Sequence, residues 1–119
     1  FQIRDDVLGV WGDEDTTGKP VGADIRRKKN SLPVVYTMSQ ATGDDRQQLV
    51  DIYQKDELTD GDITTVLGIM DKVNVRDYAE GLASEHCDQA LEALAQVELS
   101  PAARQEAEEL AHFLLVREY

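Results

Sequence analysis

Apolar residues recur along almost the whole chain at the three- and four-residue spacing of α-helices, which predicts an all-α protein. Residues 1–11 form the first such stretch. Residues 12–22 are rich in glycine, aspartate and threonine, and we expect them to form a loop. The next helix should begin with Asp24 as its N-cap and run to about residue 41. Pro33 lies inside that helix and should kink or interrupt it, because proline cannot donate the helical hydrogen bond.

Helix start signals divide the second half of the chain into further helices. They are Thr59 with Asp62, spaced as a capping box, then Asn74, and Ser100 followed by Pro101. A short helical stretch at residues 44–55 precedes them, and the longest predicted helix covers residues 75–97. Residues 32–38 are β-prone, but no strand pattern survives elsewhere. We therefore expect residues 1–119 to form a single all-α helical bundle of about six helices.

The composition limits the partners of such a bundle. The formal net charge is −12 and the isoelectric point is about 4.4, so the chain would repel nucleic acid and an anionic membrane surface. No stretch approaches the ~20 apolar residues of a membrane span, so we expect no integral membrane segment. The single cysteine, Cys87, cannot form an intramolecular disulfide, which fits a reducing compartment. These features together predict a cytoplasmic protein.

The first helix contains two adjacent carboxylates, Asp5 and Asp6, which share a face with Gln2 and Gly9. Two ionised carboxylates so close together repel each other and are costly to remove from water. A Mg²⁺ ion would relieve both costs, because it takes oxygen ligands and often bridges one or two carboxylates to substrate phosphates. An exposed acidic helix face is the alternative interpretation.

Basic residues concentrate in the stretch DIRRKKNSLP, which holds four of the twelve Lys and Arg residues of this acidic chain. Cations at a helix N-terminus oppose the helix dipole, and an anion bound nearby would explain their presence. The alternative is an exposed face or ion pairs with the acids at residues 13–15, and we apply it to Arg26 and Arg27.

Together these residues resemble the second aspartate-rich region of the trans-isoprenyl diphosphate synthases, the polyprenyl synthetase family. That region reads FQxxDDxLxxxGD, followed by a Gly-Lys pair, an aspartate, a lysine five residues further on, and a proline. The matching residues are Phe1, Gln2, Asp5, Asp6, Leu8, Gly12, Asp13, Gly18, Lys19, Asp24, Lys29 and Pro33. The match covers about the first third of the chain and looks most like bacterial geranylgeranyl diphosphate synthases.

The resemblance implies the C-terminal portion of an isoprenoid-synthase-type fold. Residues 1–41 would carry the second aspartate-rich region and the phosphate-binding helix, and residues 42–119 would be the C-terminal helices. The first helix starts at Phe1 in mid-pattern, with neither a capping residue nor an initiator methionine. We interpret the chain as a fragment of a longer synthase.

The implied activity is head-to-tail prenyl transfer. Mg²⁺ ions hold the diphosphate of an allylic substrate and draw it off as the leaving group. The double bond of isopentenyl diphosphate then attacks the allylic carbocation, and a proton is lost. Members of the family are usually homodimers, so the resemblance also implies a homodimer.

The resemblance assigns a role to several residues of this chain. Asp5 and Asp6 match the metal ligands, and Lys19 and Lys29 match lysines near the allylic diphosphate. Gln2 matches the polar residue beside the substrate pocket. The expected catalytic residues are therefore Asp5, Asp6 and Lys19. Two further acids, which match residues behind the ligands or in the ordered loop, are Asp13 and Asp24.

One position departs from the family pattern. The DDxxD motif has a third acid where this chain has Gly9, which leaves open how many metal ions the site binds. The first aspartate-rich motif, the basic residues for isopentenyl diphosphate and the residues that set product length are not in this sequence. We therefore expect half of an active site, no turnover by this chain alone, and no indication of product length.

Two other functions stay open on the sequence alone. Residues 13–24, DEDTTGKPVGAD, look like a calcium-binding helix-loop-helix module with oxygen ligands at several positions. Lys19, Pro20 and Asp24 fall at positions of that loop where other residue types are usual. The chain could also be a non-catalytic helical subunit of a prenyl synthase, which the loss of an acid at Gly9 would suit.

Overall fold

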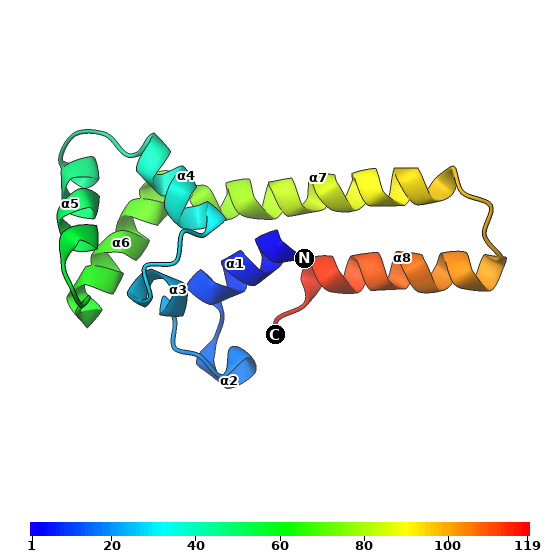
Figure 1. Ribbon diagram of the computed structural model, residues 1–119, viewed down its shortest axis with the longest axis horizontal. Coiled ribbons are helices and arrows are strands. Elements are labelled where there is room, and N and C mark those ends of the chain that lie inside the picture. The colour runs from blue at the N-terminus through cyan, green and yellow to red at the C-terminus, as the bar shows by residue number, and fades with distance from the viewer.

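The computed structural model describes residues 1–119 and contains eight α-helices and no strand (Figure 1). The helices are α1 (Gln2–Trp11), α2 (Glu14–Thr17), α3 (Ala23–Arg26), α4 (Leu32–Gln40), α5 (Gly43–Gln54), α6 (Asp60–Lys72), α7 (Val75–Ala95) and α8 (Pro101–Val116). The predicted all-α class is confirmed. The structure has more helices than expected because it adds the short α2 and divides the predicted helix at residues 24–41.

The molecule is elongated, with principal extents of 54 × 30 × 20 Å. Helices α1–α6 form a head, and α7 leaves it as a long rod that α8 follows back in the opposite direction (Figure 1). We call α7 and α8 together the hairpin. Helix α1 packs against α7, α3, α4 and α8, so it lies where the head and the hairpin meet.

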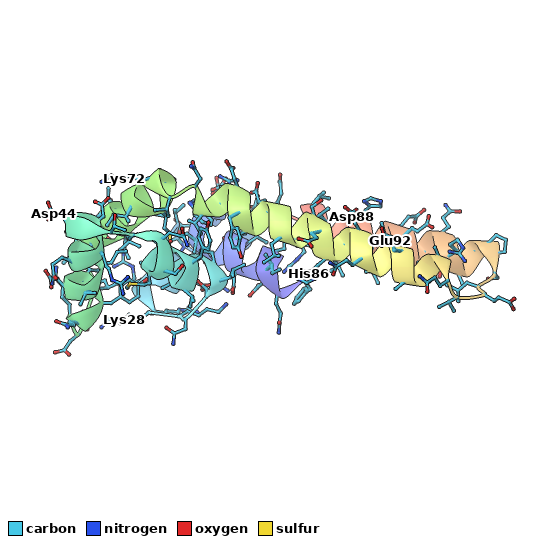
Figure 2. All side chains as sticks on the ribbon, turned by 90° about the horizontal axis from the view of Figure 1, so that it is seen from above. Lys28, Asp44, Lys72, His86, Asp88 and Glu92 are labelled. Carbon is cyan, nitrogen blue, oxygen red and sulfur yellow. The ribbon has the colours of Figure 1, made fainter.

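The hydrophobic core lies in the head. It is a cluster of twelve buried residues from α1, α3–α7 and the intervening segments, among them Val10, Ile25, Leu49, Val66 and Met70. Full burial of such a side chain contributes about 1.5–3 kcal/mol. Helix α8, in contrast, contains no buried residue. In Figure 2, Asp88 and Glu92 project from the part of α7 that lies away from the head, and both side chains are exposed.

Side-chain caps set several of the helix starts. Thr59 and Asp62 form the predicted capping box, because Asp62 N donates to Thr59 Oγ1 at 3.2 Å and Thr59 N donates to Asp62 Oδ2 at 2.9 Å. Ser100 Oγ accepts from Ala103 N at 3.2 Å, again as predicted. Asn74 does occupy the N-cap position of α7, but its side chain makes no capping hydrogen bond.

The helix predicted at residues 24–41 is interrupted, but the break lies before Pro33 and Asp24 is not the N-cap. Gly22, with φ of 76°, is the N-cap of α3, so Asp24 lies inside the helix and its carboxylate is free to face α1. The chain then breaks before α4 begins at Leu32. Pro33 falls in the first turn of α4, where its missing N–H costs nothing, and it therefore helps to start a helix instead of kinking one.

The break after α3 is a left-handed turn at Lys28, which has φ of 51°. Lys28 N donates to Ile25 O and Lys29 N donates to Asp24 O, both at 2.9 Å. This pair of bonds is the Schellman pattern that ends many helices, usually with glycine at the left-handed position. A side chain there costs roughly 1–2 kcal/mol. The turn directs Lys29 back toward α1, and this places the lysine in the site described next.

Candidate functional site

The ammonium group of Lys29 lies among three carboxylates. Its Nζ is 2.9 Å from Asp6 Oδ1, 3.2 Å from Asp24 Oδ2 and 3.5 Å from Asp5 Oδ2. Helix α1 supplies Asp5 and Asp6, α3 supplies Asp24, and the turn at Lys28 brings in the lysine. The hydrogen bond to Asp6, followed by the interaction with Asp24, raises the pKa of Lys29 well above its ordinary value and keeps it charged.

Asp6 has a second partner that ties the acids to the fold. Its Oδ2 accepts a hydrogen bond from Leu32 N at 2.8 Å, at the first residue of α4. The N-cap residue Ser31 makes no such bond, and its buried hydroxyl has no partner. Asp6 therefore caps α4 from another helix, which holds one carboxylate oxygen in place while the other faces Lys29.

The glycine at the position of the missing third acid has a structural explanation. A Cβ atom at Gly9 would overlap the carboxylate of Asp24, which is only 6% exposed and packs directly over the glycine. Asp24 therefore occupies the space where a side chain at position 9 would start. Its Oδ2 is buried and has no hydrogen-bond partner apart from the ion pair with Lys29.

A cavity of about 340 Å³ opens beside these acids. Its lining residues are mostly polar and come from α1, the segment around α2 and α3, and the segment after α8: Asp5, Leu8, Gly9, Thr17, Lys19, Asp24, Arg27, Lys29 and Tyr119. Three cations and two carboxylates thus face one volume. Such a surface suits a multiply charged anion that is bound together with a cation.

The segment around α2 positions Lys19. Asp13 is the N-cap of α2 and accepts from Asp15 N at 3.1 Å, and Gly18 ends the helix in a left-handed conformation with φ of 68°. Lys19 N then donates to Thr17 Oγ1 at 3.3 Å. The Gly-Lys pair of the sequence is therefore a helix end followed by a cavity-lining lysine. Because residues 14–17 are helical, this geometry does not support the calcium-binding loop.

The two arginines at the C-terminal end of α3 make different contacts. Arg26 donates to Leu58 O at 3.0 Å and pairs with Asp60, so it belongs to the structure of the head, although not through the predicted acids. Arg27 is exposed, as predicted, and it also lines the cavity, which the sequence did not indicate. Tyr119, at the far end of the sequence, was not expected at all.

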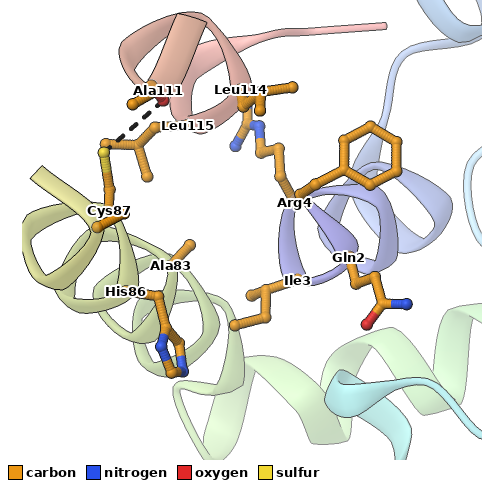
Figure 3. Close-up of a pocket in the computed structure, with 11 residues that line it drawn as sticks. Gln2, Ile3, Arg4, Ala83, His86, Cys87, Ala111, Leu114 and Leu115 are labelled. Carbon is orange, nitrogen blue, oxygen red and sulfur yellow. Dashed lines mark hydrogen bonds between the residues drawn. The ribbon is translucent and has the colours of Figure 1, made fainter. Parts of the chain in front are cut away.

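Gln2 lies elsewhere. It borders a second, mainly apolar pocket of about 460 Å³ between α1, α7 and α8, together with Ile3, Arg4 and His86 (Figure 3). Cys87 is also at this pocket, with its Sγ 3.7 Å from Ala111 O. The structure therefore separates Gln2 from the acidic cavity, and its substrate-binding role stays a prediction.

The donor chemistry of the acidic cavity fits a hard divalent cation. Carboxylate oxygens are the ligands that Mg²⁺ prefers, and the Lys29 ammonium group already lies between them as a positive charge. Asp24 Oδ2 is a further buried carboxylate oxygen at this place, and its ion pair with Lys29 is the one contact that it makes with a charged group. In the present arrangement no group of three or more acidic, histidine or cysteine side chains is placed to hold a metal ion. A cation at Asp5 and Asp6 would thus need ligands from water or substrate as well.

The prediction that the chain has no membrane-spanning segment can be compared with the helices of the structure. None of the helices combines the length and the apolar character that crossing a bilayer requires.

Known proteins that this chain resembles in sequence are prenyl diphosphate synthases. A sequence model of the family described as polyprenyl synthetase matches residues 1–70. The geranylfarnesyl diphosphate synthase of Aeropyrum pernix is 38% identical over 97% of this chain and 34% of its own length. The (2E,6E)-farnesyl diphosphate synthase of Mycobacterium tuberculosis is 31% identical over 99% of this chain and 34% of its own length.

The solved structures agree. The geranylgeranyl pyrophosphate synthetase from Pyrococcus horikoshii superimposes with a TM-score of 0.87 and 38% identity, over 98% of this chain and 35% of that one. A polyprenyl synthetase from Streptomyces coelicolor gives a TM-score of 0.86 at 29% identity, over 97% of this chain and 36% of that one. The chain thus spans about a third of the length of the proteins that it matches.

Proposed function

This chain belongs to the polyprenyl synthetase family, and on that premise we propose that it supplies the second aspartate-rich half of the active site of a trans-prenyltransferase. The substrates would be an allylic diphosphate and isopentenyl diphosphate, joined head to tail. The observation that carries the proposal is the convergence of Asp5, Asp6 and Asp24 on Lys29, beside a cavity that Lys19 also lines.

The cofactor in this proposal is Mg²⁺, held by Asp5 and Asp6. When bound, it would neutralise charge on the departing diphosphate, which is the main catalytic requirement of this reaction. The first step breaks the C–O bond of the allylic diphosphate and leaves an allylic carbocation. The double bond of isopentenyl diphosphate then forms the new C–C bond, and loss of a proton restores a double bond in the product.

The basic residues of the cavity would bind and orient the leaving group. Lys19 and Lys29 present ammonium groups to the volume beside the acids, and Arg27 adds a guanidinium that can bind two phosphate oxygens at once. Lys29 has a second role in this proposal. Its single positive charge offsets part of the negative charge of the three carboxylates before the cation and the diphosphate arrive, which limits their mutual repulsion.

The remaining features of the proposal concern the complete enzyme. It would be a cytoplasmic homodimer, and the upstream two-thirds would supply the first aspartate-rich motif and the site for isopentenyl diphosphate. The present chain alone would bind part of the substrate but give no turnover. Its position at the C-terminal end of the longer synthase stays a prediction.

Replacement of the two α1 acids in the complete enzyme tests the proposal. Asp5→Asn and Asp6→Asn should each lower kcat on the order of 100-fold or more, because several kcal/mol of charge stabilisation are lost. Asp44→Asn, at an exposed position of α5, is the matched control and should leave the rate unchanged. Wild-type rates in both α1 variants, with helix content preserved by circular dichroism, would refute the assignment.

A further inference from the structure

The part of the chain that carries Lys29 is too short to hold its own shape. Helix α3 has four residues, and α4 does not begin until Leu32. Between them Lys28 is in a left-handed conformation, which persists only where surrounding contacts fix it. Helix α3 lies between α1 and α6 (Figure 1). The acids of α1 contact Lys29 from one side, and a second set of contacts fixes the turn from the other.

The second set of contacts comes from two basic side chains, Arg26 and Lys28, which we call the anchor pair. Arg26 Nη1 donates to Leu58 O at 3.0 Å, and Nη2 pairs with Asp60. Lys28 Nζ donates to Lys55 O. Both carbonyl groups belong to the connection between α5 and α6. Neither member of the anchor pair lines the acidic cavity, so the pair acts on the turn and not on a bound ligand.

The connection that accepts these hydrogen bonds is itself well fixed. Leu58 is 6% exposed and belongs to the core cluster of the head. Lys55 Nζ pairs with Asp62 Oδ1 at 2.6 Å, and Asp62 forms the capping box with Thr59 at the start of α6. Main-chain carbonyls in such a segment have little freedom to move. They give the anchor pair acceptors at defined positions, as supporting groups behind a binding site must.

This arrangement explains why the stretch at residues 26–29 is so basic in an acidic chain. It holds four of the twelve Lys and Arg residues, and the structure divides them into two pairs. Arg27 and Lys29 line the cavity. Arg26 and Lys28 alternate with them along the chain and bind the connection between α5 and α6 instead. Two of the four cations thus face the candidate site, and the other two attach the same segment to the core of the head.

We propose that Arg26 and Lys28 are positioning residues for Lys29, which they hold among the carboxylates by fixing the turn against the connection between α5 and α6. This inference rests on the proposed function, because it requires that the cavity binds a diphosphate together with its cation. Without the anchor pair, the turn could relax from the disfavoured conformation at Lys28. The ammonium group of Lys29 would then spend less time in the site.

Binding of inorganic pyrophosphate in excess Mg²⁺, measured by isothermal titration calorimetry on the complete enzyme, tests the anchor pair. Arg26→Met and Lys28→Met should each weaken binding about threefold to fivefold, and together about tenfold, because each removes one hydrogen bond that fixes the turn. Arg26→Lys should recover part of the loss, since a lysine can still donate to the Leu58 carbonyl. Wild-type affinity in the double variant would overturn the inference.

Lys72→Met is the matched control for the removal of a lysine charge. Lys72 also forms an ion pair within the head, with Nζ 2.7 Å from Asp45 Oδ1. Figure 2 shows Lys72 and Lys28 at opposite edges of the head. The control should bind pyrophosphate as the wild type does. Equal weakening in Lys72→Met and Lys28→Met would mean that net charge, and not the position of the turn, sets the affinity.

Lys28→Gly separates positioning from stability. Glycine adopts the left-handed conformation without strain but cannot reach Lys55 O, so this variant should melt at a higher temperature than Lys28→Met. Its affinity for pyrophosphate should nevertheless be as low as that of Lys28→Met. If the affinity recovers together with the melting temperature, Lys28 has a purely structural role and the inference is wrong.

A double-mutant cycle with Lys29→Met tests whether the anchor pair acts through that lysine. In the Lys29→Met background, the combined Arg26→Met and Lys28→Met substitutions should change affinity less than about twofold. A tenfold effect in both backgrounds would overturn the inference. If the anchor-pair variants bind normally while Asp6→Asn does not, the inference is wrong and the proposed function stands. If the wild type fails to bind pyrophosphate with Mg²⁺, both are wrong.

Discussion

The head and the hairpin of this molecule are built on different principles. The head buries a cluster of twelve residues and holds nearly every group of the candidate site. Each helix of the hairpin is longer than any helix of the head. Even so, α8 has no buried residue and exposes Leu110, Phe113 and Val116. The candidate site therefore lies on the part of the molecule that has its own hydrophobic core. The main contribution of the hairpin is to return residues 117–119 to the head. Substitutions paired between the two parts can test this division.

The largest contrast should come from apolar truncation. Leu49→Ala in α5 removes a side chain that is 1% exposed and should lower the free energy of unfolding by about 2–5 kcal/mol. Leu110→Ala in α8 removes one that is 57% exposed and should change the free energy of unfolding by about 0.5 kcal/mol or less. Urea unfolding followed by circular dichroism measures both. Equal losses would show that the hairpin is as well packed as the head.

Two glycines sharpen the comparison. Gly9→Ala in the head forces a methyl group into the Asp24 carboxylate and should cost about 1–3 kcal/mol. Gly81→Ala in α7 meets no atom within 4 Å and should stabilise the protein by about 0.5–1 kcal/mol through helix propensity. Thermal unfolding of the two variants gives shifts of opposite sign. If Gly9→Ala were stabilised, the Asp24 carboxylate would have to move away easily, and it would not be packed tightly over position 9.

The turn of the hairpin depends on one arginine. Arg104 in α8 donates to Leu94 O in the last turn of α7 at 3.2 Å and to Val97 O in the connection after α7 at 2.9 Å. Arg104→Ala should cost about 0.5–1.5 kcal/mol, the usual range for a hydrogen bond of this kind. Amide hydrogen exchange should quicken around residues 94–100 and stay unchanged in α5 and α6. Faster exchange in the head would indicate that the two parts unfold as one unit.

The smallest effect is a dependence on pH within the head. The hydrogen bond from Lys55, followed by the one from the Thr59 backbone, lowers the pKa of Asp62 from 3.8 to about 2. The folded state therefore favours the ionised carboxylate, and this stabilisation is complete above about pH 4 and disappears as the pH falls toward 2. Since Lys55 is half exposed, solvent screens the pair and the effect is modest.

Asp62→Asn should flatten the change in urea midpoint between pH 4 and pH 2 relative to the wild type. Glu85→Gln, on the exposed face of α7, is the control and should keep the wild-type slope. An unchanged slope in Asp62→Asn would mean that other carboxylates govern the acid sensitivity of the head.

Periodicity and capping residues predict much of the fold, because both are local. Thr59, Asp62 and Ser100 act on backbone groups within three residues of themselves, so their roles can be derived from sequence spacing. The break between α3 and α4 could not be predicted in this way. It depends on a lysine in a left-handed conformation, which local propensity disfavours, and on the carboxylate of Asp6 in another helix, which accepts a hydrogen bond from the first residue of α4.

The candidate site also combines features that the sequence indicates with features that depend on tertiary packing. Asp5 and Asp6 could be selected because they are adjacent on one helix, and Lys19 and Lys29 because they match the family motif, before their positions were known. Their mutual contacts follow from tertiary packing, and so does the overlap that explains Gly9. Tyr119 could not be predicted, because nothing in the sequence near it indicates that α8 returns to α1.

The hydrogen bond between Arg4 and Arg117 spans a separation of 113 residues, so it has a consequence for the order of folding. Closing a loop of this length costs conformational entropy that only the already formed intermediate structure can reduce. The head and the hairpin must therefore largely assemble before residues 117–119 can reach α1. On this reasoning the cavity gains its last wall at the end of folding, and a slow final kinetic phase should report on completion of the site.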